Sequence, residues 1–146
     1  MKKELVNLTN GYIANVGVAY IKLHNLHWNV VGGQFKAVHE YTESIYDALA
    51  DVLDEVAEVL KMHGEMPLAS LKDYLAAATI DELGSKELSV KDTLDILLAD
   101  LKTLQAQADA IRTMADADGN YHLVAVMEDN LSNYAKNIWF VSSMLK

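Results

Sequence analysis

Apolar residues recur at intervals of three or four between residues 35 and 63, which is the spacing of a helix with one buried face. They are Val38, Tyr41, Ile45, Leu49, Val52, Val56 and Leu60. At about 100° per residue these positions fall within one arc roughly 100° wide. The pattern predicts one long amphipathic helix from Phe35 to His63, which Gly64 can cap and Pro67 prevents from continuing.

The preceding segment predicts a helix over residues 2–31 that is apolar on most of its circumference. One apolar face contains Leu5, Leu8, Tyr12, Val16, Ala19, Leu23, Leu26 and Val30, and an adjoining band contains Ile13, Tyr20, His24 and Trp28. A helix of this kind is buried on more than one side. Because one small bundle does not cover both sides, we expect a subunit interface there. Gly32 and Gly33 then break the helix.

The second half of the chain predicts a short helix and two further long helices. Ser70 is a candidate N-cap for a helix over residues 70–77, and residues 79–88 form a connection. Ser89 and Asp92 resemble a capping box at the start of the third long helix, and Asn120 can cap the fourth. The inner faces of these two helices are predicted to be apolar, without His or acidic residues. They contain Leu94, Leu97, Leu98, Leu101, Leu104, Ala108, Ile111, Met114, Leu123, Val124, Met127, Leu131, Tyr134, Ile138, Val141 and Leu145.

Four long helices with one crossover that contains a short helix are typical of an all-α four-helix bundle of the up-down-down-up kind. A length of 146 residues suits a single domain over residues 1–146, and a composition that is 51% hydrophobic with one Pro suits helices. The sequence contains no run of about 18 apolar residues, so it predicts no membrane span. The absence of Cys excludes disulfides and thiolate metal sites and is compatible with a cytoplasmic protein. A net charge of −9 disfavours general affinity for nucleic acid and favours cations.

Candidate metal ligands gather between residues 23 and 65, where four of the five His lie. Carboxylates and imidazoles without thiols suit Fe, Mn or Zn. Di-iron bundles carry Glu-x-x-His on two helices, and this chain contains no such motif. The remaining arrangement is a site between subunits, with His27 and His39 from one chain and Asp54 and Glu58 from a twofold-related chain.

The acidic residues of this segment face away from the helix's own core. Glu43, Asp47, Asp54 and Glu58 share an arc with His39 on the side opposite the apolar stripe. Glu43 and Asp47, one and two turns beyond His39, are candidates for binding a second ion. Such a stripe is more often a solvated helix face, and the spacing alone leaves both interpretations open.

Several short motifs together resemble the Dps family, the miniferritins or DNA-binding proteins from starved cells. They are Leu26-His27-Trp28-Asn29, Gly33-Gln34-Phe35, Val38-His39-Glu40, Asp54-Glu55-Val56-Ala57-Glu58, Gly64, Pro67 and Trp139. The likeness covers essentially the whole chain, and the combination is highly specific although no single motif is. The resemblance implies a ferritin-like four-helix subunit that assembles into a hollow dodecamer. Such a protein oxidises Fe(II), preferentially with hydrogen peroxide, and stores the ferric mineral in its cavity. The resemblance also implies that the protein is cytoplasmic and protects against oxidative stress.

The resemblance also implies roles for particular residues. The family's two imidazole ligands match His27 and His39, and the acid one turn beyond the second imidazole matches Glu43. The partner subunit's ligands match Asp54 and Glu58, so that each site holds iron, Fe(II) and then Fe(III), as a pair of ions. The aromatic residue after the first His, which absorbs oxidising equivalents in the family, matches Trp28.

The sequence departs from the family pattern in three places. Val59 stands where the family often has Arg, Gly64-Glu65 replaces the usual Gly-Gly, and the basic N-terminal tail that binds DNA in some members is missing. We therefore do not expect DNA binding. Two other functions remain open at this point: a buffer that holds Zn or Mn at the same ligands without redox turnover, and a protein that coats DNA.

Overall fold

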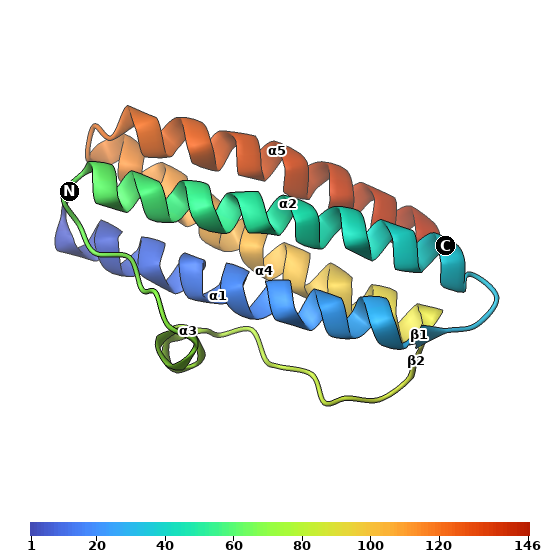
Figure 1. Ribbon diagram of the computed structural model, residues 1–146. Helices are drawn as coiled ribbons and strands as arrows, with labels where there is room; N and C mark the ends of the chain where they lie inside the picture. Colours follow the sequence, from blue (N-terminus) through green and yellow to red (C-terminus); the bar gives the residue numbers. More distant parts are fainter.

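The computed structural model describes residues 1–146 as four long helices and one short helix. The helices are α1 (Lys3–Asn29), α2 (Phe35–Met62), α3 (Leu71–Ala77), α4 (Val90–Ala117) and α5 (Tyr121–Met144). α1 and α2 form an antiparallel pair, the connection through α3 runs back along the bundle, and α4 and α5 form a second antiparallel pair (Figure 1). The up-down-down-up bundle with a short extra helix in its crossover is therefore confirmed.

The predicted helix ends are confirmed at three caps. The side chain of Ser70 accepts a hydrogen bond from the backbone of Asp73, that of Ser89 from Asp92, and that of Asn120 from Leu123. These bonds satisfy backbone N–H groups that have no partner within the helix. Gly64 follows α2 with a φ of 77°, a backbone conformation that glycine adopts without strain.

A short parallel strand pair was not predicted from the sequence. β1 (Val30–Val31) pairs with β2 (Leu88–Ser89) directly before α4 begins. Two-residue strands leave no periodic pattern that could be recognised in the sequence. The pair ties the start of α4 to the end of α1 and so fixes the end of the bundle where the loop of Gly32 and Gly33 leads into α2.

The core is one cluster of 30 buried apolar residues drawn from all four long helices. α1 contributes most to it, because its residues from Tyr12 to Ala19 are buried on every side. The expectation that α1 is covered on more than one face is explained partly within the subunit, since α3 and its flanking connection pack against it. None of the five helices combines the length and the hydrophobicity that a membrane span requires.

Asn15 attaches the crossover to the bundle. Its side chain is fully buried on α1, and its Oδ1 accepts hydrogen bonds from the backbone N–H groups of Thr79 (2.8 Å) and Ile80 (2.9 Å). Its Nδ2 donates to the Thr79 hydroxyl and to Gln107 of α4, each at 2.9 Å. One amide therefore joins α1, the crossover and α4, which positions the chain that leads to β2.

The inner faces of α4 and α5 are not purely apolar, which corrects the sequence prediction. Tyr134 and Asn130 of α5 form a buried hydrogen-bond network with Tyr12 of α1, and burial raises the pKa of both phenols. Asp100 of α4 forms an ion pair of 2.8 Å with Lys22 of α1, and burial raises the pKa of this carboxyl despite its lysine partner. Tyr134 continues the apolar pattern of α5 because most of its side chain is an apolar ring, so the periodicity does not reveal its hydroxyl contact. The partners of Asn130 and Asp100 lie on α1, so the pattern along α4 and α5 does not reveal these pairs either.

Candidate metal centre

His27 and His39 face each other across the loop that joins α1 to α2. Their ring centroids lie 3.7 Å apart with an interplanar angle of 14°. His27 is 5% exposed and His39 is partly exposed. The last turn of α1 and the first two turns of α2 therefore hold both imidazoles in one place, because the intervening loop is short enough to bring the two helix ends together.

Reciprocal hydrogen bonds fix the two imidazoles. Nδ1 of His27 donates to the backbone carbonyl of His39 at 2.6 Å, and Nδ1 of His39 donates to the carbonyl of His27 at 2.8 Å. A carbonyl oxygen only accepts, so Nδ1 of each ring carries a proton and Nε2 is the nitrogen that remains available to a ligand. The Thr42 hydroxyl, whose own proton is given to Val38, lies 3.2 Å from Nδ1 of His27 and supports the same tautomer. Both rings are thus oriented with Nε2 as the nitrogen that could bind a metal ion.

Glu43 brings a carboxylate to this imidazole pair. It lies one turn beyond His39 on α2, and its Oε1 is 3.9 Å from Nε2 of His27. Its side chain is 55% exposed. The hydroxyl of Tyr46 donates a hydrogen bond of 3.2 Å to the same Oε1. Desolvation and the nearby charge of Glu43 raise the pKa of Tyr46, so this phenol is protonated throughout the neutral range.

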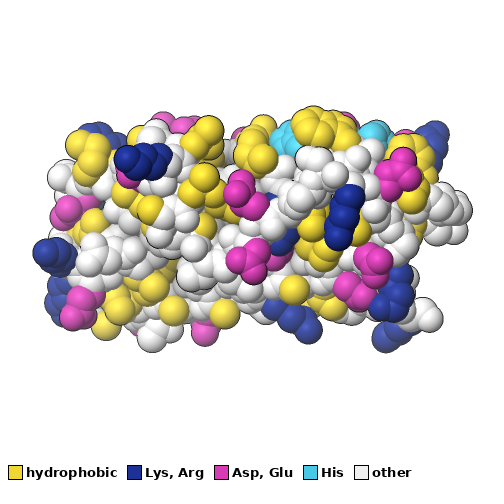
Figure 2. Space-filling model, turned by 90° about the horizontal axis from the view of Figure 1, so that it is seen from below, with side chains coloured by type: hydrophobic (Ala, Val, Ile, Leu, Met, Phe, Trp, Pro, Cys, Tyr) yellow, Lys and Arg dark blue, Asp and Glu magenta, His cyan; other side chains and the backbone are white.

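Aromatic side chains extend from this cluster over the surface. His24 stacks on Tyr46 with centroids 3.9 Å apart, and Trp28 lies 5.5 Å from His24. The Trp28 side chain, which follows His27 in the sequence, is 68% exposed. On the face seen in Figure 2, histidine comes to the surface along one edge, on either side of a hydrophobic side chain, while acidic and basic groups are interspersed elsewhere.

Asp54 and Glu58 do not join the cluster within one subunit. Both are exposed on the outer face of α2. A helix rises about 1.5 Å per residue, so Asp54 lies roughly 22 Å along α2 from His39. No three His, Asp or Glu side chains of one subunit lie close enough together to hold a metal ion. One chain thus supplies two imidazoles and the nearby Glu43, and leaves the predicted acidic pair unused.

Two residues that contact the cluster, Thr42 and Tyr46, were not predicted from the sequence. Thr42 and Tyr46 each follow a predicted ligand by three residues on α2, a spacing that places them on the same side of the helix as that ligand. Their contacts depend on α1 packing against α2. The donors themselves fit Fe(II), Mn(II) or Zn(II), because imidazole nitrogen and carboxylate oxygen are ligands that these ions share.

Known proteins resemble this chain in sequence and in structure. A family model described as a ferritin-like domain matches residues 6–146. The chain is 32% identical over 132 residues to the DNA protection during starvation protein of Helicobacter pylori. The alignment covers 90% of this chain and 92% of that relative.

Solved structures share the fold. The crystal structure of Helicobacter cinaedi CAIP superimposes with a TM-score of 0.94 at 35% identity and covers 97% of this chain and 99% of that one. The DPS protein of Vibrio cholerae O1, described as a member of a broad superfamily of ferritin-like diiron-carboxylate proteins, has a TM-score of 0.93 at 29% identity, and the match covers 99% of this chain and 90% of that one.

Proposed function

Because this chain belongs to the Dps family of ferritin-like proteins, we propose that it oxidises Fe(II), preferentially with hydrogen peroxide, and stores the ferric product inside a hollow oligomer. The observation that supports this most strongly is the pair of stacked imidazoles, His27 and His39, each with a free Nε2. Beside them Glu43 adds a hard oxygen ligand. Iron is the substrate and cargo of this site.

The site is completed by a second copy of the chain. His27, His39 and Glu43 of one subunit hold iron together with Asp54 and Glu58 of its twofold-related partner. The midpoint between positions 39 and 54 lies between residues 46 and 47. If the α2 helices of two copies run antiparallel about a twofold axis at this midpoint, position 39 of one copy lies opposite position 54 of the other. A twofold interface is self-complementary, so each dimer contains two equivalent sites.

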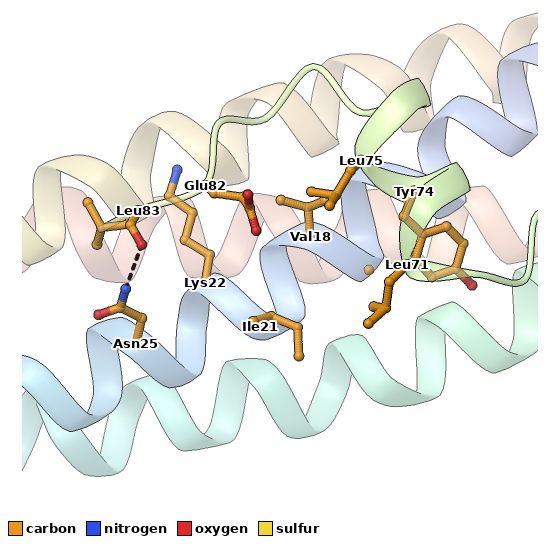
Figure 3. Close-up of a pocket in the computed structure, with 10 residues that line it drawn as sticks. Val18, Ile21, Lys22, Asn25, Leu71, Tyr74, Leu75, Glu82 and Leu83 are labelled. Carbon is orange, nitrogen blue, oxygen red and sulfur yellow. Dashed lines mark hydrogen bonds between the residues drawn. The ribbon is translucent and has the colours of Figure 1, made fainter. Parts of the chain in front are cut away.

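A groove on the surface of α1 supports contact with a second copy. An apolar groove lies between α1 and α3, and Ile21, Leu71 and Leu75 line it with exposed side chains (Figure 3). Figure 3 also shows the hydrogen bond from Asn25 to the carbonyl of Leu83 that closes the groove at one end. Burying such side chains removes apolar area from water, at about 25 cal/mol per Å². α1 carries both this groove and His27, so a single interface with a second copy covers the groove and completes the site. Twelve copies are the assembly that the resemblance to the Dps family implies.

The ligand chemistry favours oxidation of bound iron. Carboxylates stabilise Fe(III) more than Fe(II), while imidazole maintains affinity for Fe(II). Two Fe(II) ions each give up one electron, and one peroxide takes both electrons with two protons to become two waters. Because both electrons are taken together, no hydroxyl radical is released. Trp28, exposed beside His27, is placed to absorb any oxidising equivalent that a singly occupied site leaves over. Ferric ions then nucleate mineral on acidic side chains that face the cavity.

The activity is tested by adding Fe(II) to the protein without oxygen and then adding hydrogen peroxide. We expect an immediate rise in ultraviolet absorbance from ferric species and consumption of about one peroxide for every two Fe(II), by electron balance. Buffer with the same iron and peroxide is the control. A protein that binds Fe(II), Zn(II) or Mn(II) but oxidises iron no faster than this control would instead be a metal buffer.

DNA protection by this chain is proposed to be indirect. The relative from Helicobacter pylori is named for DNA protection, but this chain carries a net charge of −9, which opposes binding to a polyanion. Removing Fe(II) and peroxide together limits radical damage without contact with DNA.

A further inference from the structure

Tyr46 lies at the centre of a cluster of rings beside the imidazole pair. Its phenol stacks on His24 with centroids 3.9 Å apart and an interplanar angle of 23°. His27 and Tyr20 meet the same ring edge-on, at centroid distances of 5.3 and 6.2 Å. Three rings from α1 thus surround one ring from α2, and this fixes where the Tyr46 hydroxyl points.

That hydroxyl is bonded to Glu43. The Tyr46 oxygen lies 3.2 Å from Oε1 of Glu43, the same oxygen that lies 3.9 Å from Nε2 of His27. Glu43 is more than half exposed, and a free glutamate at such a position samples several rotamers. The Tyr46 hydroxyl is the one hydrogen-bond donor to this carboxylate within the subunit. It therefore selects the rotamer that faces His27.

The ring beneath Tyr46 is itself fixed to the backbone. Nδ1 of His24 donates to the carbonyl of Tyr20 at 2.7 Å, one turn earlier on α1. This bond sets the plane of the His24 ring, on which the phenol lies. The order of dependence runs from the α1 backbone through His24 and Tyr46 to the Glu43 carboxylate.

We propose that Tyr46 is a positioning residue that holds the Glu43 carboxylate at the imidazole of His27, and that His24 holds Tyr46 in place. This rests on the proposed function, since it assigns Glu43 to the iron site. Residues that orient a ligand through one hydrogen bond typically contribute roughly 10- to 100-fold to metal affinity. Tyr46 therefore affects binding of the metal without touching it.

The test is Tyr46→Phe, which removes the hydroxyl and keeps the ring. Co(II) alone, without any oxidant, is titrated into the assembled protein, and its visible absorption bands report the ligand geometry. We expect Tyr46→Phe to bind Co(II) about 10-fold more weakly and with shifted bands. Tyr20→Phe is the matched control, because it removes a hydroxyl from the same ring cluster that is not bonded to Glu43; it should retain the parent's affinity and bands. Equal melting temperatures of the two variants show that both fold.

His27→Ala distinguishes a failure of the role of Tyr46 from a failure of the proposed iron site. If His27→Ala loses Co(II) binding while Tyr46→Phe retains the parent's affinity and bands, Tyr46 has no positioning role and the iron site stands. If His27→Ala also binds Co(II) as the parent does, the proposed function has its site in the wrong place, and the role of Tyr46 fails with it.

Discussion

Replacing His27 with Ala is expected to lower the rate of peroxide-driven Fe(II) oxidation by about 100-fold or more. Each factor of ten corresponds to about 1.4 kcal/mol, so this requires that the lost imidazole contributes roughly 3 kcal/mol. The loss is specific, because His39 is held by the backbone carbonyl of residue 27, and Ala keeps that carbonyl. The second imidazole therefore stays in place with its Nε2 free.

The rate is measured by stopped-flow absorbance after peroxide is added to the iron-loaded protein. His122→Ala is the matched control, since it removes an exposed imidazole at the start of α5, at the end of the bundle opposite to the His27 site (Figure 1). The control is expected to keep the parent's rate. A His27→Ala variant within about threefold of the parent would contradict the site assignment, because it would leave less than about 0.7 kcal/mol for the imidazole.

Replacing Asn15 with Ala is expected to destabilise the fold by roughly 2–6 kcal/mol. The substitution leaves the backbone N–H groups of Thr79 and Ile80 without their acceptor, and a buried unpaired group costs about 1–3 kcal/mol. Domains are typically stable by only about 5–15 kcal/mol, so this is a large fraction of the total. The crossover is expected to detach from α1 before the helices unfold.

Urea unfolding and hydrogen exchange together test this role of Asn15. The exchange rates of the Thr79 and Ile80 amides should rise sharply in Asn15→Ala, while amides inside α4 change less. Asn7→Ala, an exposed substitution on the same helix, provides the matched control and should change the stability by less than about 0.5 kcal/mol. An Asn15→Ala protein with the parent's unfolding midpoint and unchanged exchange at these two amides would show that the crossover is held in another way.

The helices could be predicted from the sequence because their apolar spacing and their caps are local features. Ser70, Ser89 and Asn120 each bond within three residues of their own position, so no tertiary information is needed. Asn15 shows the limit of this approach. It stands within an apolar helix face, and its four hydrogen bonds go to three residues that lie more than 60 residues away along the chain.

The candidate site could be predicted in part. The resemblance named His27, His39 and Glu43. In the structure the rings of His27 and His39 stack, and Oε1 of Glu43 lies 3.9 Å from Nε2 of His27, but the three side chains do not form a metal site within one subunit. Tyr46 could not be found from the pattern, because Tyr at that position fits an amphipathic helix equally well as a core residue, and its role depends on stacking with α1.

The roles of Asp54 and Glu58 remain predictions. A single chain places both of them in solvent and far from its own imidazoles. Their assignment therefore depends on how two copies assemble, which the spacing along one helix does not determine.

Mixing two inactive variants tests most directly whether the site is shared between subunits. His27→Ala and Asp54→Ala are dissociated, combined in equal amounts and reassembled, and peroxide-driven Fe(II) oxidation is compared with that of each variant alone. In a mixed dimer one site carries both substitutions and the other carries neither. Random pairing should therefore restore about a quarter of the parent's sites. A mixture that stays as inactive as its components, although the two chains are shown to have co-assembled, would contradict a site built from two subunits.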